Sequence, residues 1–255
     1  MSPSIRRELN VALRSFRLPG LAIALLFFAL LDPPVIKYMN VILEQVGSAS
    51  EIQITMPDPT PEMALTQFVT DIGGIGAFVA VIMFMGIVAA EKSNGVTEWV
   101  LTRPVTRSEY LSAKVLVWAI GVTVCVFGSG IIAWLYTWSL LGPVSFANMA
   151  TALVAIIAYI LFILAFTFAG SVVLNSQFAA GLVGMGAIFA GVFVNFIAKA
   201  LGINRYLPYS AGDLAMEVVS GAISPVEIVP PVVCALVVAF LLLVYSYRRF
   251  ARMEL

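Results

Sequence analysis

Long apolar runs separated by short polar segments make up the pattern along the chain. Six runs are long enough to cross about 30 Å of hydrocarbon at about 1.5 Å per residue of α-helix. They cover roughly residues 18–41, 68–90, 115–140, 149–174, 178–198 and 228–247. We therefore predict an all-α integral membrane protein with six transmembrane helices, built as a single domain over residues 1–255.

The first of these runs is the shortest in apolar length, because Asp32, Pro33 and Pro34 interrupt it. Aspartate followed by proline has the form of an N-cap and first-turn pair. We therefore expect a kinked span, in which Asp32 caps a second, amphipathic helix near the outer interface. A secretory signal peptide over residues 1–31 is the alternative interpretation.

Residues 1–17 have the pattern of an amphipathic helix. The apolar residues at helical spacing are Ile5, Leu9, Ala12, Leu13 and Phe16. The polar residues on the other side are Arg7, Asn10, Arg14 and Arg17. Such a helix can lie in the headgroup layer with its arginines on anionic lipid, and we predict this placement. A cytosolic helix docked on a partner protein is the alternative.

The distribution of lysine and arginine predicts the orientation. Inner loops of membrane proteins are enriched in both residues. With both termini in the cytoplasm, only Lys37, Lys199 and Arg205 of the 14 lysines and arginines lie at the outer side. We therefore predict that the N- and C-termini are both cytoplasmic.

Composition agrees with a membrane protein and excludes several enzyme classes. Hydrophobic residues make up 61% of the chain and charged residues 11%, and the mean hydropathy is +1.02. The chain contains no histidine, which excludes H-E-x-x-H zinc sites and nucleophiles that depend on histidine. Cys125 and Cys234 both lie in apolar runs and are read as packing residues. No G-x-x-x-x-G-K-[ST] motif is present, so we expect no nucleotide, metal or other cofactor to bind directly to this chain.

The longest charged passage, residues 91–114, lies between the second and third spans and is predicted to be cytoplasmic. Asn94 and Gly95 are typical helix C-cap residues, so the second span should end there. Residues 96–101 then have the pattern of a short amphipathic helix. Thr106 and Glu109 have capping-box spacing and should open the next helix.

This passage resembles the segment E-K-x-x-G-T-x-E-x-x-L-x-x-P-V-x-R that joins the second and third spans of ABC-2 type transporter permeases. The matching residues are Glu91, Lys92, Gly95, Glu98, Leu101, Pro104, Val105, Arg107 and Lys114. The chain departs from the pattern at Val96, where the family usually has threonine, and Thr97 is shifted by one position. Length, span number and the amphipathic N-terminus are similar to that family along the whole chain.

The resemblance implies a permease subunit of a prokaryotic cytoplasmic membrane that carries no motor of its own. Two separate ATPase subunits would bind ATP and Mg²⁺, and a second permease subunit, identical or related, would complete the complex. Export is the direction that the family most often serves, and nucleic acid is not an expected partner. The residues that we expect to couple to the ATPase are Glu91, Glu98, Trp99, Val100, Arg103 and Arg107.

Two further features are candidates for function within the spans. Ala180, Gly184, Ala187 and Gly191 form a stripe of small residues in the fifth span, which serves packing within the chain or, alternatively, an interface with the second permease. Asp71 is the acid nearest to an apolar span and is a candidate for the substrate path. An ion-coupled secondary carrier and a membrane scaffold subunit are the competing functions.

Overall fold

Every element of the computed structural model is a helix in the part of the chain that it describes, which comprises residues 3–42, 58–102 and 105–253. Six helical segments in these residues are long and apolar enough to cross a membrane. The predicted fold class, an all-α protein with six spans, is therefore confirmed.

The spans are formed by one or more helices each. A short helix, α1 (Pro3–Arg14), precedes the first span, α2 (Arg17–Lys37). The second span joins four pieces, and a small helix follows it: α4 (Pro61–Asp71), η1 (Ile72–Gly76), α5 (Ala77–Phe84), α6 (Ala89–Ser93) and then α7 (Val96–Leu101). The remaining elements are α8 (Arg107–Leu141), α9 (Phe146–Val173), α10 (Gln177–Ala200), η2 (Asn204–Tyr206), α11 (Ser210–Val219), η3 (Pro225–Ile228) and α12 (Val229–Ala251).

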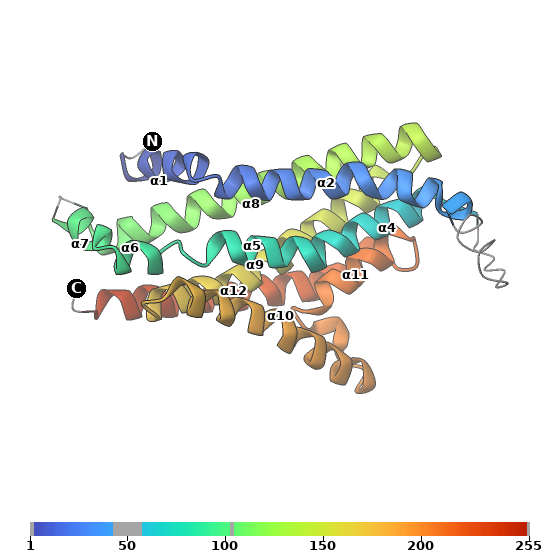
Figure 1. Ribbon diagram of the computed structural model, residues 1–255. Coiled ribbons are helices and arrows are strands. Elements are labelled where there is room, and N and C mark those ends of the chain that lie inside the picture. The colour runs from blue at the N-terminus through green and yellow to red at the C-terminus, as the bar shows by residue number, and fades with distance from the viewer. Residues whose placement is uncertain (1–2, 43–57, 103–104, 254–255) are drawn as a thin grey trace.

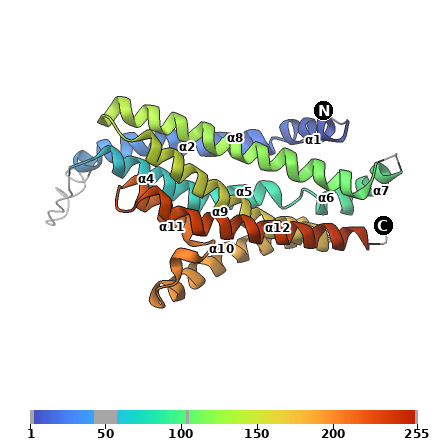
Figure 2. The same ribbon diagram turned by 180° about the vertical axis from the view of Figure 1, so that it is seen from behind.

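The spans form one elongated bundle with both chain termini at the same end. Figure 1 shows the N- and C-termini beside α6 and α7, which we call the terminal end. The opposite end, called the far end, holds the start of α4, the loop between α8 and α9, and α11; Figure 2 shows the same arrangement from behind. The polar segment around α7 therefore lies at the end that holds both termini, as the predicted topology requires.

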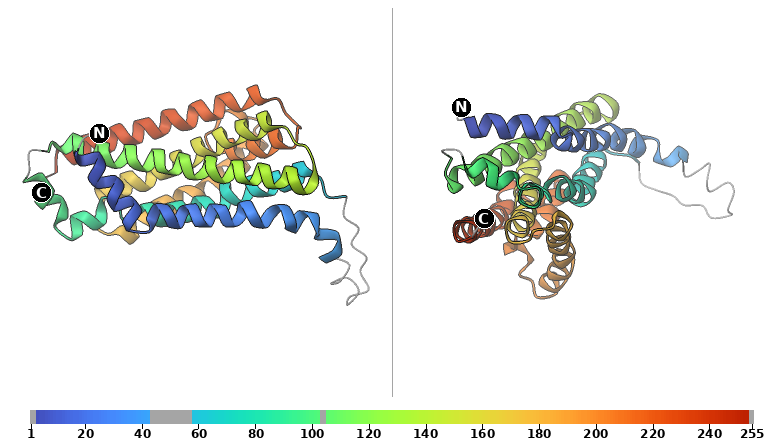
Figure 3. Two further views of the ribbon diagram at one scale, coloured as in Figure 1. Left: turned by 90° about the horizontal axis from the view of Figure 1, so that it is seen from above. Right: turned by 60° about the vertical axis from the view of Figure 1, so that its left-hand side comes forward.

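Helix α9 is the centre of the bundle. It packs against α12, α10, α11, α5 and α8, and 78% of its most apolar window is buried, compared with 56% for the next most buried span. The helices α2, α8 and α12 run the length of the bundle in Figure 3. A helix that is apolar on all sides is suited to such a central position.

Side-chain caps begin four of the helices. The hydroxyl oxygens of Thr60, Thr106, Ser145 and Ser176 each accept a hydrogen bond from the backbone N–H three residues later, over 3.1–3.4 Å. These bonds satisfy amides that have no partner inside the helix. The cap predicted at Thr106 is confirmed, and it sets the start of α8 directly after the α7 segment.

The break predicted in the first span at Asp32 is wrong. Helix α2 continues through Pro33 and Pro34, and Asp32 lies inside the helix rather than capping a new one. The backbone N–H of Tyr38 still donates to the carbonyl of Pro34 over 3.0 Å. Continuing the helix loses only the bonds that the prolines cannot make, whereas a break inside the membrane would leave more backbone groups without partners.

The second span is interrupted twice, which the sequence did not predict. The π-helix η1 follows α4, and a turn at residues 85–88 separates α5 from α6. At this turn the hydroxyl oxygen of Ser171 on α9 accepts the N–H groups of Val88 (3.0 Å) and Ala89 (2.9 Å). A residue of another span thus satisfies the backbone that the turn releases, as buried backbone groups require.

Candidate coupling site at the terminal end

Helix α7 presents one face to the surface and the other to the chain. It begins at Gly95, whose φ of 69° is in the left-handed region that glycine adopts without strain. Glu98 and Trp99 face outward, and Trp99 is 59% exposed. Thr97 and Val100, three residues apart and therefore on one helical face, are 0% and 7% exposed. The predicted short helix is confirmed, with a narrow outward face.

Of the expected ATPase contacts in this segment, Val100 lies on the inward face of α7. Val100 is buried against the core cluster of this chain, so its side chain supports α7 from inside and is not available to a partner protein. Arg103 lies outside the described residues. Of the residues predicted for the surface of this helix, Glu98 and Trp99 are those that the structure places outward.

The inward face of α7 is joined to the neighbouring helices by a chain of hydrogen bonds. Thr97 Oγ1 lies 3.2 Å from the hydroxyl of Tyr110 on α8. The Tyr110 hydroxyl donates to Oε2 of Glu91 on α6 over 2.6 Å, a short bond of the kind that an ionised acceptor forms. Because the Tyr110 oxygen can then accept from Thr97, the two bonds lock α6, α7 and α8 together.

Lys114 is the centre of a buried ionic network. Its Nζ lies 3.1 Å from Oε2 of Glu91 and 3.1 Å from Oε2 of Glu8 on α1. Arg7 also contacts Glu91, over 3.3 Å, and the indole N–H of Trp118 donates to Glu8 over 3.1 Å. The side chains of Lys114 and Glu8 are only 1% and 3% exposed. Two carboxylates thus meet two cations, which gives the network no net charge and joins α1 to the α6–α7–α8 segment.

Glu91 was predicted as an ATPase contact, and the structure places it inside this network. Its side chain is 15% exposed, and both of its oxygens have partners within the chain. Glu8 was not predicted at all. The sequence did contain a signal for it. Glu8 shares a helical face with the apolar residues Ile5 and Ala12, and an acid on such a face needs a buried partner.

Two further cations in this region hold the ends of α9 and α12. Nη1 of Arg107 donates to the backbone carbonyls of Phe250 (3.3 Å), Ala251 (3.1 Å) and Met253 (2.6 Å), which close the C-terminus of α12. Nζ of Lys92 donates to the carbonyl of Val172 at the end of α9 over 2.8 Å. Cations at helix C-termini stabilise the carbonyls that lack intrahelical donors. Arg107, which is one of the residues expected to couple to the ATPase, ties α8 to α12.

This arrangement joins α1, α6, α7 and α8 through contacts between side chains. Its titratable side chains are paired with one another, and no cluster of three or more histidine, cysteine, aspartate or glutamate residues occurs in the described part of the chain. We call Glu8, Glu91, Tyr110 and Lys114 the coupling network.

The stripe of small residues in α10 packs inside the chain, which is the first of the two uses that the sequence allowed. Ala180, Gly184, Ala187 and Gly191 are all buried. A Cβ atom at Gly184 would collide with Thr167 of α9, and one at Gly191 would collide with the ring of Tyr209. These residues therefore let α10 approach α9 and α11 closely. The face of α10 that the chain leaves exposed carries Phe178, Phe189, Val192, Phe193 and Phe196.

Asp71 lies far from the coupling network, at the end of α4 in the far half of the bundle. Its Oδ2 accepts a hydrogen bond from Nε2 of Gln67 one turn earlier, over 3.0 Å. Asp71 therefore belongs to a separate polar site.

Comparison with known proteins agrees with this topology. The chain is 31% identical over 199 residues to YxlG of Bacillus subtilis (strain 168), a transmembrane protein described as uncharacterized, and the match covers 76% of this chain and 75% of YxlG. No solved structure matches the chain. The family model "ABC-2 family transporter protein" matches residues 35–248, which include all of the coupling network except Glu8. The chain therefore belongs to the ABC-2 family of transporter membrane proteins.

Proposed function

We propose that this multi-pass protein is the permease subunit of an ATP-binding-cassette transporter of a prokaryotic cytoplasmic membrane. In this proposal the terminal end faces the cytosol, and the spans form the path of an exported substrate. Two separate ATPase subunits bind ATP and Mg²⁺, since the chain has no phosphate-binding motif of its own. Membership of the ABC-2 family supports an ATPase partner.

The observation that carries the proposal is the division of α7 into two faces. Outward, Trp99 and Glu98 form a small amphipathic surface at the end of the bundle. A short helix that presents an aromatic anchor is suited to a groove on a partner protein, and tryptophan is enriched among residues that dominate binding energy. Inward, Thr97 and Val100 hold the helix to the chain. The same helix can therefore receive a force and pass it on.

The coupling network supports a route for that force. Thr97 connects α7 to Tyr110, and Tyr110 connects to Glu91 and hence to the second span. Lys114 extends the connection to α1, and Arg107 extends it to α12. Closure of the ATPase dimer on nucleotide would thus move several spans together rather than one loop.

A second permease subunit, identical or related, is part of the proposal. Because the small residues of α10 pack within the chain, such a subunit would use another face of the bundle. A place for Asp71 on the substrate path also remains a proposal, consistent with its position beside the interrupted part of the second span.

The test is to purify the protein from native membranes in mild detergent and to identify co-purifying ATPase subunits by mass spectrometry. We expect Trp99→Ala to reduce the recovered ATPase and its substrate-stimulated turnover by about 30-fold, since loss of a central anchor costs about 2 kcal/mol. Glu98→Lys should act in the same direction. Tyr206→Ala is the matched control, because this aromatic is 68% exposed and belongs to η2, between α10 and α11.

Two results would reject the proposal. A wild-type protein that transports its substrate with no ATPase bound would favour an ion-coupled carrier. An ATPase that binds equally well to the wild type, Trp99→Ala and Glu98→Lys would show that α7 is not the docking element.

A further inference from the structure

Two carboxyl groups meet between the first and second spans in the far half of the bundle. The side chain of Asp32 on α2 is buried, with 3% exposed, and its Oδ2 has no hydrogen-bond partner in the described part of the chain. The carboxyl group of Asp71 lies within hydrogen-bonding contact of it. Asp71 in turn accepts the bond from Gln67. Asp32 is thus a buried acid with one oxygen that receives no hydrogen bond, and its neighbour is a second carboxyl group.

No cation among the described residues neutralises this pair. Lys37, further along α2, donates to the carbonyl of Leu140 over 3.1 Å instead. The other titratable groups on α2, α4 and the elements packed against them in this half of the bundle are Tyr38, Glu62, Tyr136, Tyr159, Asp213 and Glu217; α5 and η1 carry none. Among the charged groups of the described residues, Asp71 is the one that lies in contact with Asp32. The pair also offers too few ligands for a divalent metal, since no group of three candidate ligands occurs among the described residues.

Two ionised carboxylates in contact within an apolar bundle repel one another strongly, so such a pair keeps a proton. We propose that Asp32 and Asp71 form a proton-binding site in which one proton is shared between the first and second spans. Asp71 already accepts a hydrogen bond from the amide N–H of Gln67, so its carboxyl group is suited to accept a second one. Asp32 carries the proton, and its O–H donates to Asp71. The proposal does not depend on the proposed function, since it follows from the contact of the two acids alone.

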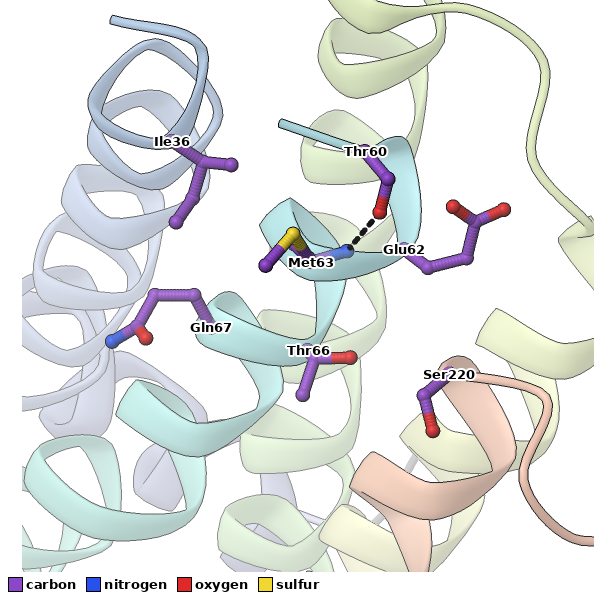
Figure 4. A pocket seen from close by; sticks show the side chains of 7 residues that line it. All are labelled: Ile36, Thr60, Glu62, Met63, Thr66, Gln67 and Ser220. Carbon is purple, nitrogen blue, oxygen red and sulfur yellow. Dashed lines mark hydrogen bonds between the residues drawn. The ribbon is translucent and has the colours of Figure 1, made fainter. Parts of the chain in front are cut away.

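A route for the proton leads to the far-end surface. A cavity of about 570 Å³ opens there, and Gln67 is one of the residues that line it. Figure 4 shows Gln67 on α4 near Ile36 of α2, with Thr66 and Glu62 further round the same helix. Because Gln67 lines the cavity and also bonds to Asp71, one side chain separates the pair from a space that is large enough to hold water. On deprotonation the proton would pass from the Asp32 oxygen to water in this cavity.

Loss of the proton would act directly on the backbone of the second span. The π-helix η1 begins at Ile72, immediately after Asp71, and π-helical turns are found mainly where a helix serves a function. Gly76 at the end of η1 packs against Leu25 of α2, so the same segment contacts the span that carries Asp32. Two negative charges would push α2 and α4 apart beside η1, where the regular series of α-helical backbone hydrogen bonds is already interrupted.

The experiment uses the purified full-length protein in lipid nanodiscs, with two readouts. Infrared difference spectroscopy detects the C=O stretch of a protonated carboxyl group, and thermal unfolding is measured from about pH 6 to about pH 9. The variant is Asp32→Asn, whose amide can donate to Asp71 as the protonated acid would, without a proton to lose. Glu62→Gln is the matched control, because it removes one carboxylate of α4 that lines the cavity but does not bond to Asp71.

We expect a protonated carboxyl band at neutral pH in the wild type and in Glu62→Gln, and its loss in Asp32→Asn. The bound proton stabilises the folded protein, so the unfolding temperature of the wild type should fall as the pH rises, while that of Asp32→Asn should change much less. A wild type with no such band at neutral pH would overturn the proposal. So would restoration of wild-type stability at about pH 9 by Na⁺ or K⁺ alone, which would identify a cation site.

Discussion

The substitution that tests the coupling network most directly is Lys114→Met. Methionine is close to lysine in length and fills the same buried space, but it removes the ammonium group that Glu8 and Glu91 share. The two carboxylates are not affected equally. Glu91 keeps Arg7 and the Tyr110 hydroxyl, whereas Glu8 keeps only the Trp118 N–H among the contacts described for it.

The cost therefore falls on Glu8 and on the helix that carries it. Removing one partner of a buried ion pair costs about 3–5 kcal/mol while the other charge stays buried. The other contacts of α1 are weaker. Ala12 is buried and Ile5 is partly buried, worth about 1–2 kcal/mol together. The Arg7–Glu91 pair, with Arg7 35% exposed, and the hydrogen bond from the Ser4 hydroxyl to Glu109 each add about 1 kcal/mol. The unpaired charge therefore offsets most of the free energy that docks α1, and we expect α1 to leave the bundle more often while the spans stay folded.

Amide hydrogen exchange of the protein in nanodiscs measures this local opening. Because about 1.4 kcal/mol corresponds to a factor of ten, the amides of α1 should exchange at least about tenfold faster in Lys114→Met, and those of α9 should be unchanged. Adding Glu8→Gln should restore most of the protection, since a neutral amide can still accept from Trp118 and needs no cation.

Lys199→Met is the matched control for this prediction. It removes the same charge from an ion pair with Asp213 in which Lys199 is 54% exposed, so local exchange should change little. If α1 stays protected in Lys114→Met, the ion pair does not hold the helix. If Glu8→Gln brings no recovery, the unpaired carboxylate is not the cause of the opening.

Three further substitutions test the contacts that define the fold. Arg107→Ala should speed hydrogen exchange in the last turn of α12, because the carbonyls there lose a charged donor worth about 1–3 kcal/mol, and Arg107→Lys should restore part of it. Gly184→Ala should lower the unfolding temperature by overpacking α10 against α9, whereas Gly186→Ala, where a Cβ has open space, should not. Ser171→Ala should speed exchange at Val88 by leaving its N–H without an acceptor, a cost of about 1–3 kcal/mol.

Features that depend on local sequence were predictable. The apolar runs predict six spans because a helix must bury about 20 apolar residues to cross a membrane, whatever it packs against. The starts of α7 and α8 were predictable because Gly95 acts through its own backbone and Thr106 through its own side chain. These residues need no distant partner to define an element, so one sequence is sufficient to recognise them.

Features that depend on another span were not predictable in the same way. The turn at residues 85–88 is satisfied by Ser171, which is more than 80 positions away in the sequence. Small residues in α10 indicate that another helix comes close, but not whether that helix belongs to the same chain. The continuation of α2 through Pro33 has a similar reason. A break inside the membrane would leave backbone groups without hydrogen bonds, and this cost outweighs the local preference of proline.

The second span connects the two polar sites of the protein. Asp71 lies at one side of its π-helix, and Glu91 lies beyond the turn at residues 85–88, so both interruptions fall between the acid pair and the coupling network. A regular helix resists bending because each residue is bonded to the turns before and after it, whereas η1 and the turn lack part of that ladder. The remaining long spans contain neither kind of interruption in the described residues. Relative movement of the two ends of the bundle is therefore expected to be concentrated in the second span, with Ser171 and Gly76 at the points where it bends.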